Sequence, residues 1–100
     1  MIPLPDSFHE RGFDYRILRR DGRIALLQKS KPNQKISYEL IIIQQRQAEK
    51  IYGRAYEARE VVPRPEQWGV CAWTPFNLEI AHIKFDELRR KEGFQHEGIA

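Results

Sequence analysis

Hydrophobic and polar positions alternate over residues 13–20, which predicts a β-strand with one buried face. Its apolar positions are Phe13, Tyr15 and Ile17. A second strand is predicted over residues 23–30, and the Asp-Gly pair before it favours a two-residue turn with positive φ at both positions. Pairing outward from this turn places Arg20 opposite Arg23 and keeps the apolar faces together.

Residues 36–44 are the most β-prone segment, because β-branched side chains are enriched there and glycine is absent. We interpret this segment as the central strand, entered from a turn at residues 31–35. Its second half should be covered on both faces, since residues 40–43 are apolar at every position. A further strand is predicted over residues 67–74.

The segment 46–62 supports two predictions. Several apolar residues stand at helical spacing, which indicates a helix interrupted at Gly53. They are Ala48, Ile51, Tyr52, Ala55 and Tyr56. The same segment is equally compatible with an extended ribbon that ends at a turn around Pro63 and Pro65. The pattern leaves both predictions open.

The last predicted element is a helix within residues 74–93. Two residues are candidates for its N-terminal cap, Thr74 before a proline and Asn77, and a basic run before Gly93 suits its C-terminus. The apolar stripe expected to pack on the sheet is Leu78, Ala81, Phe85 and Leu88.

Ile80 and Ile83 fall on nearly the opposite side of this helix. They are covered by the tail or by the 48–60 segment, or they are exposed, as scattered apolar surface residues often are. The alternative is a contact patch for a protein partner or for a second copy of the chain.

These elements predict an α+β fold, an antiparallel sheet of about four strands with a C-terminal helix packed on one face. A chain of 100 residues has room for one core, so we expect a single domain over 1–100. The ordered core should span roughly 13–92, with flexible segments at 1–10 and 93–100.

Composition indicates a cytoplasmic protein. Hydrophobic residues make up 41 % of the chain, and its single cysteine, Cys71, cannot form an intramolecular disulfide. The N-terminus has no basic head before an apolar stretch, and the longest aliphatic run covers only residues 40–43. We expect no signal peptide and no membrane span.

Charge is distributed unevenly along the chain. The net charge is +3, yet residues 11–35 carry eight basic side chains against two acidic ones. Arginine guanidinium groups suit phosphates and carboxylates, so this hairpin and loop is our candidate contact for a partner or for nucleic acid. The contact residues are Arg16, Arg19, Arg20, Arg23, Lys29, Lys31 and Lys35. The alternative is a solvated hairpin tip that prevents edge pairing.

Signals for catalysis are weak. The chain has no glycine-rich phosphate loop, nucleophile elbow or zinc-protease motif. His82 and Asp86 stand four residues apart, but two side chains do not make a metal site. Cys71 suits a buried strand position better than a reactive thiolate. We expect no catalytic residue, no cofactor and no metal.

The sequence between Gly53 and Phe85 resembles a group of small proteins from bacteriophages, prophages and other mobile elements. The shared features are a Pro-x-x-Glu-x-Trp-Gly step and a terminal helix of the Leu-Glu-x-Ala-x-x-x-Phe kind. Here they correspond to Pro63, Glu66, Trp68, Gly69, Leu78, Glu79, Ala81 and Phe85. The resemblance covers roughly residues 13–90 and implies a small accessory protein, without an activity that could be transferred to named residues.

We therefore expect a non-enzymatic interaction protein of phage or mobile-element type, which binds or inhibits a host protein. Ile80 and Ile83 are the candidate protein interface, and a homodimer is a further alternative. The second hypothesis is a nucleic-acid-binding protein that uses the basic hairpin at 16–35.

Overall fold

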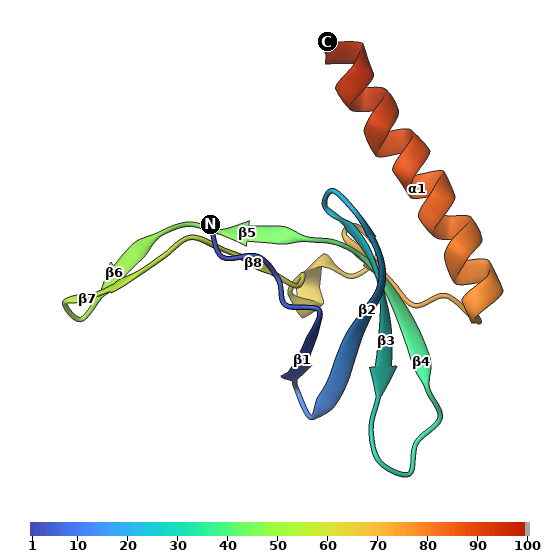
Figure 1. Cartoon of the computed structure of the whole chain (residues 1–100), viewed down its shortest axis with the longest axis horizontal. Helices are drawn as coiled ribbons and strands as arrows, with labels where there is room; N and C mark the ends of the chain where they lie inside the picture. Colours follow the sequence, from blue (N-terminus) through green and yellow to red (C-terminus); the bar gives the residue numbers. More distant parts are fainter. Residues whose placement is uncertain (100) are drawn as a thin grey trace.

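The structure is a computed structural model, which describes the backbone of residues 1–99 and the side chains of residues 1–91. Its main sheet is antiparallel and has five strands in the order β1-β2-β3-β4-β9 (Figure 1). The strands are β1 Ser7–Glu10, β2 Phe13–Asp21, β3 Ile24–Ser30, β4 Ser37–Ile42 and β9 Ala72–Trp73. Helix α1, Leu78–Ile99, packs on β3 and β4, which confirms the α+β fold class.

The β2–β3 hairpin forms as predicted but in a different register. Its two-residue turn is Gly22–Arg23, and only Gly22 has a positive φ, of 59°. Arg20 therefore lies opposite Ala25, and the prediction that it lies opposite Arg23 is wrong. A bulge at Leu18 shifts the register again further along the hairpin. In this turn only Gly22 adopts the left-handed conformation, so Asp21 does not have to adopt it and is not strained.

The predicted central strand is β4, but β3 occupies the centre of the sheet and β4 lies between β3 and β9. Its second half is covered on both faces, as expected. Leu40 belongs to the apolar cluster beneath α1, whereas Ile41 belongs to the cluster on the opposite face.

The strand predicted over 67–74 is mostly wrong, because only Ala72–Trp73 pairs with the sheet. A short 3-10 helix, η1 Pro65–Gln67, precedes a tight turn at Gly69, whose φ is 89°. Within this segment Gly69 N–H donates to the Ala72 carbonyl at 2.8 Å, and the Cys71 carbonyl accepts a hydrogen bond of 2.8 Å from the Ile42 N–H of β4. The exposed Trp68 and Val70 thus lie in a turn.

Residues 44–61 form an extended ribbon, which decides between the two alternatives for this segment. Strands β5 Gln44–Arg46 and β8 Arg59–Val61 pair at its base, and β6 Glu49–Ile51 and β7 Arg54–Tyr56 pair at its end. The ribbon projects away from the main sheet (Figure 1). We call residues 44–61 the arm.

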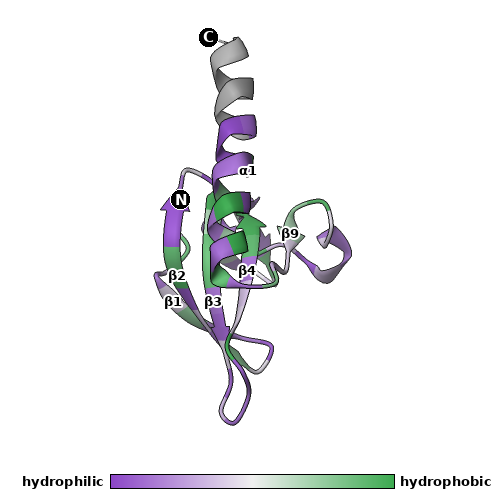
Figure 2. Cartoon of the chain, turned by 90° about the vertical axis from the view of Figure 1, so that its right-hand side faces the viewer, coloured by the Kyte–Doolittle hydropathy of each residue, from purple (hydrophilic) through white to green (hydrophobic). Residues whose placement is uncertain are grey.

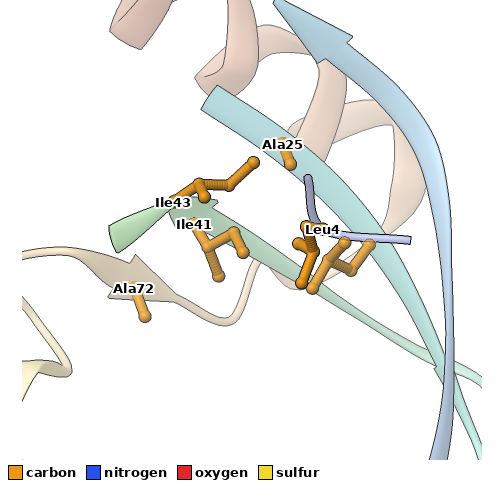
Figure 3. Close-up of a cluster of buried hydrophobic side chains, with 6 residues drawn as sticks. Leu4, Ala25, Ile41, Ile43 and Ala72 are labelled. Atoms are coloured by element: carbon orange, nitrogen blue, oxygen red, sulfur yellow. The ribbon is translucent and has the colours of Figure 1, made fainter. Parts of the chain in front are cut away.

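Two apolar clusters lie on the two faces of the sheet. On the α1 side, Phe85 and Ala81 pack on Ile24, Leu26 and Leu40, where hydrophobic segments of helix and sheet meet (Figure 2). The opposite cluster is shown in Figure 3 and contains Leu4, Ala25, Leu27, Ile41, Ile43 and Ala72. Because Leu4 is buried and residues 7–10 form β1, the ordered core begins earlier than the predicted residue 13.

Helix α1 begins at the second of the two predicted caps. Asn77 Oδ1 accepts a hydrogen bond of 2.8 Å from the Ile80 N–H, as an N-terminal cap does. The predicted stripe is confirmed at Ala81 and Phe85, which are fully buried. The helical backbone continues past the predicted end at Gly93. The side chains of the predicted flexible tail at 93–100 lie outside the described residues.

Candidate interaction surfaces

The predicted basic cluster is distributed over several surfaces of the molecule. Arg19 contacts α1 on one face of the sheet, whereas Arg20 contacts the arm on the other side of β2. The β2–β3 turn and the β3–β4 loop, which holds Lys31 and Lys35, lie at opposite ends of the sheet (Figure 1). The seven basic residues therefore do not share one anion-binding surface.

Arg19 joins β2 to α1. Its Nη2 donates to Asp86 Oδ1 at 2.7 Å, and its guanidinium carbon lies 4.2 Å from the centre of the Phe85 ring. The hydrogen bond from Arg19 is the main reason that the pKa of Asp86 is lowered. His82 Nδ1 also lies 3.4 Å from Arg19 Nη1, so the His82 and Asp86 pair faces an arginine.

Arg20 and Arg23 hold the base of the arm. Arg20 Nη2 donates to Glu60 Oε2 at 2.6 Å, and Glu60 Oε1 accepts from the Leu4 N–H at 2.9 Å. These two donors lower the pKa of Glu60, Arg20 having the larger effect. Arg23 Nε donates to the carbonyl of Ile43, the residue before β5, at 3.0 Å.

The remaining basic residues have separate surroundings. Lys29 Nζ lies 3.1 Å from Glu39 Oε1 and 4.1 Å from the centre of the Phe13 ring. Lys31 Nζ is 5.3 Å from the same ring, so both lysines contact an aromatic face. Arg16 and Lys35 are exposed, Arg16 on β2 and Lys35 in the β3–β4 loop.

The side chain of Tyr15 lies beside the Lys29–Glu39 pair. Burial and the nearby carboxylate of Glu39 raise the pKa of Tyr15 to about 12. The ring of Phe8 stacks on Tyr15 with 5.1 Å between centroids. The buried carboxylate of Glu39 is thus paired with the Lys29 ammonium and lies near aromatic rings. These contacts join β1, β2, β3 and β4.

The arm ends in a two-residue turn with left-handed backbone at both positions. Ile51 pairs with Arg54, and the residues between them are Tyr52, with φ of 50°, and Gly53, with φ of 80°. Glycine suits this geometry, but a tyrosine is uncommon there. At the base, Ile2 adds a short parallel bridge to Arg59. Its N–H donates to the Ala58 carbonyl at 2.9 Å.

Apolar side chains are exposed along the end of the arm. Tyr52 has a relative exposure of 103 %, and Ile51 and Tyr56 are also exposed. Beside them the arm has a hollow of about 300 Å³. Its lining residues are Ile2, Arg46, Gln47, Glu49, Ile51, Tyr56, Glu57 and Arg59.

A second candidate surface lies along the side of α1 that faces β9. A groove of about 390 Å³ separates the helix from the end of the sheet. It is lined by Leu40, Trp73, Thr74, Pro75, Ile80, Lys84, Glu87, Leu88 and Lys91. The structure thus places Ile80 in the wall of a groove and leaves Ile83, which is 51 % exposed, outside it.

Side chains of the types that can ligate metals are dispersed over the described part of the chain. Within it, no group of three or more His, Cys, Asp and Glu side chains is close enough to hold a metal ion. His9 Nδ1 instead lies 2.9 Å from Asp14 Oδ1 on an exposed part of the β1–β2 hairpin. No helix among the described residues is long and apolar enough to cross a membrane.

Comparisons with protein-family models, with curated proteins and with solved structures found no match for this chain.

The arm tip is the surface that sequence reasoning missed. The only local signal was Gly53 between two short runs, because glycine suits a tight hairpin turn, whereas Tyr-Gly is not a favoured turn pair. Helical spacing of Ile51, Ala55 and Tyr56 concealed it, since the same residues also fit an amphipathic helix.

Proposed function

We propose that this chain is a small non-enzymatic interaction protein that binds another protein through the tip of its arm. The observation that carries the proposal is Tyr52, fully exposed at a left-handed backbone position. A non-glycine residue there costs about 1 kcal/mol or more. Within the described chain this tyrosine buries no surface in return, and insertion into a partner would offset the cost.

The anchored base of the arm supports the same function. Arg20, Arg23 and Ile2 all bond to the arm or to the residue before it. A ribbon fixed at its base loses less conformational entropy on binding than a free loop would lose. The arm therefore presents Tyr52 to a partner in a prearranged position.

Charge on the arm favours a protein partner over nucleic acid. Residues 44–61 carry four cationic side chains against three acidic ones, a nearly balanced set. Binding to phosphates requires a surplus of cations on one surface. Arg19, Arg20 and Arg23 of the basic hairpin are already bonded within the chain, which weakens the nucleic-acid alternative.

The resemblance to phage and prophage proteins extends the proposal to the kind of partner. Such a protein would bind or inhibit a protein of its bacterial host, and Tyr52 with Ile51 and Tyr56 would form the contact. Tyrosine and arginine are, with tryptophan, the side chains enriched at the energetic centres of protein interfaces, and the guanidinium carbon of Arg54 lies 5.7 Å from the centre of the Tyr56 ring.

A photo-crosslinking amino acid at position 52 tests this function in bacterial cells. The same amino acid at Asn33, at the exposed tip of the β3–β4 loop, is the matched control. We expect a protein adduct at position 52 that is absent at position 33. The purified adduct partner should then bind the Tyr52→Ala variant at least about tenfold more weakly than the natural chain.

Two outcomes would contradict the proposal. One is an equal set of adducts from positions 52 and 33. The other is binding of labelled single-stranded DNA or RNA whose affinity falls steeply with salt concentration and which Tyr52→Ala abolishes. This would make the arm a nucleic-acid contact.

A further inference from the structure

The outer edge of β7 and β8 already holds an extended segment at the base of the arm. Ile2 lies parallel to Arg59 there. Its N–H donates to the Ala58 carbonyl at 2.9 Å, and its carbonyl accepts a hydrogen bond of 2.9 Å from the Glu60 N–H. A strand that is added to the edge of a sheet forms backbone hydrogen bonds of this kind. This edge of the arm therefore has the geometry that an added strand requires.

Toward the tip, the same edge continues along β7 without a partner. Within the described backbone, no strand other than β6 pairs with β7. The turn at Tyr52–Gly53 lies between the paired residues Ile51 and Arg54, and a two-residue turn of this kind is closed by a hydrogen-bonded pair. Because hydrogen-bonded and non-hydrogen-bonded pairs alternate along an antiparallel ladder, the next pair, Lys50 and Ala55, is a non-hydrogen-bonded one. The backbone N–H and carbonyl of Ala55 therefore point outward, away from β6.

The two edges near the tip of the arm differ in how readily another strand can approach them. Charged side chains, lysine above all, hinder the pairing of a sheet edge with another chain, and Lys50 is the middle residue of β6. Ala55, the middle residue of β7, has a small uncharged side chain. The guanidinium carbon of Arg54 lies 5.7 Å from the centre of the Tyr56 ring, so this cation extends over its own strand. The edge of β7 is therefore the more open of the two.

The hollow of about 300 Å³ on the arm lies beside this edge. Its apolar lining consists of Ile2, Ile51 and Tyr56, of which Ile2 belongs to the segment that already pairs with the edge. Successive side chains of a strand point to opposite faces, so alternate side chains of a strand added to β7 lie on the side of the hollow. Its volume is at the lower end of the range for ligand sites, which is sufficient for an apolar side chain.

We propose that β7 binds an extended segment of a partner protein as an added strand, with an apolar side chain of that segment in the hollow. The N–H and carbonyl of Ala55 form the backbone hydrogen bonds, which are independent of the partner's sequence, and the hollow selects for apolar residues at alternate positions. This inference rests on the proposed function, because it specifies the form of the partner segment that the arm contacts.

A library of random linear heptapeptides, displayed on yeast and selected against the immobilised chain, tests this inference. We expect enriched peptides with apolar residues at alternate positions, whose affinities are then measured by fluorescence anisotropy. Ala55→Pro should weaken their binding by about tenfold or more, because proline removes the outward N–H and blocks the approach of a second backbone. Lys50→Pro is the matched control. It removes the outward N–H of β6, at the opposite edge, and should leave peptide binding unchanged.

Methylation of the backbone nitrogens of an enriched peptide tests strand addition without any change in the chain. An added strand directs every second N–H group toward its neighbour. Methylation should therefore weaken binding by about tenfold or more at alternate positions of the paired stretch, and have little effect at the positions between them. This alternation distinguishes strand addition from a contact made by side chains alone, even where Ala55→Pro unfolds the arm.

Four results would overturn the inference. They are a selection that enriches no peptide, equal binding of the enriched peptides to Ala55→Pro and to the natural chain, effects of methylation that do not alternate, and self-association of the natural chain that Ala55→Pro abolishes. The last result would assign the edge to a second copy. Any of them, together with a protein adduct at position 52, would leave the proposed function standing. Peptide binding that Ala55→Pro abolishes, without an adduct at position 52, would contradict the proposed function and retain β7 as a strand-binding edge.

Discussion

The guanidinium of Arg20 lies 2.6 Å from the carboxylate of Glu60, a residue forty positions later in the chain. This ion pair joins the β2–β3 hairpin to the base of the arm. Both side chains are partly buried, with 28 % and 12 % of their surfaces exposed, so the pair is less screened than a pair at the surface. The arginine-rich hairpin thus stabilises the position of the arm.

Substitution of Arg20 by glutamine should loosen the arm while the sheet stays folded. Glu60 would keep the hydrogen bond from the Leu4 N–H and the weaker electrostatic effect of Arg23. We expect a loss of about 1 to 2 kcal/mol in the free energy of unfolding. Hydrogen exchange should accelerate at the amides of residues 44–61 before it does so in β3.

Arg16→Gln is the matched control, because Arg16 is exposed on the same strand. This substitution should leave the free energy of unfolding and the hydrogen-exchange rates of the arm amides unchanged within experimental error. Equal effects from the two substitutions would contradict the role assigned to Arg20.

Acidification should weaken the attachment of the arm and of the helix together. Arg20 and Arg19 lower the folded-state pKa values of Glu60 and Asp86. Carboxyl groups with lowered pKa values contribute stability above their unfolded pKa, near 4, and this contribution disappears as the pH falls through the folded values. Urea unfolding at neutral pH and at successive acidic values should therefore show a decline that is shallower in Glu60→Gln and in Asp86→Asn.

The two candidate caps of α1 make a direct comparison. Asn77→Ala removes the side-chain acceptor for the Ile80 N–H and should cost about 1 kcal/mol. Thr74→Ala alters the candidate that the helix does not use and should cost much less. Thermal unfolding followed at the helical circular-dichroism signal measures both, and similar losses would mean that Asn77 is not the cap.

Tyr52→Asn should stabilise the chain and weaken partner binding. Asparagine tolerates the left-handed conformation, and Asn-Gly is a favoured pair for such a turn. We expect a gain of roughly 0.5 to 1 kcal/mol in the free energy of unfolding, together with weaker binding of the partner identified by crosslinking. A destabilised variant would indicate that the tyrosine packs within its own chain.

Much of the sheet could be predicted from the sequence, because local residue patterns determine its strands and turns. Alternation over 13–20 and the glycine turn specify the β2–β3 hairpin, and the run of isoleucines specifies a strand covered on both faces. The stripe at Ala81 and Phe85 specifies the buried side of α1 for the same reason.

Long-range contacts decided what the sequence left open. Ile2 pairs with the arm, and Arg20 reaches Glu60, so the extended form of residues 44–61 depends on residues far from it in the chain. The β2–β3 register differs from the prediction because the turn lies at Gly22–Arg23 and not at Asp21-Gly22, and the bulge at Leu18, which an apolar and polar pattern does not reveal, changes it again further along. The sequence identifies the candidate arginines, whereas the groups to which they bond follow only from the three-dimensional structure.

The tip of the arm lies outside the two apolar clusters that stabilise the domain. Neither apolar cluster among the described residues includes any of residues 49–56. Apart from the turn residues Tyr52 and Gly53, substitutions in that segment can therefore accumulate over generations without disturbing how the chain folds. Under the proposed function, changes at the tip alone would alter which protein is bound, while the five-stranded sheet is inherited unchanged.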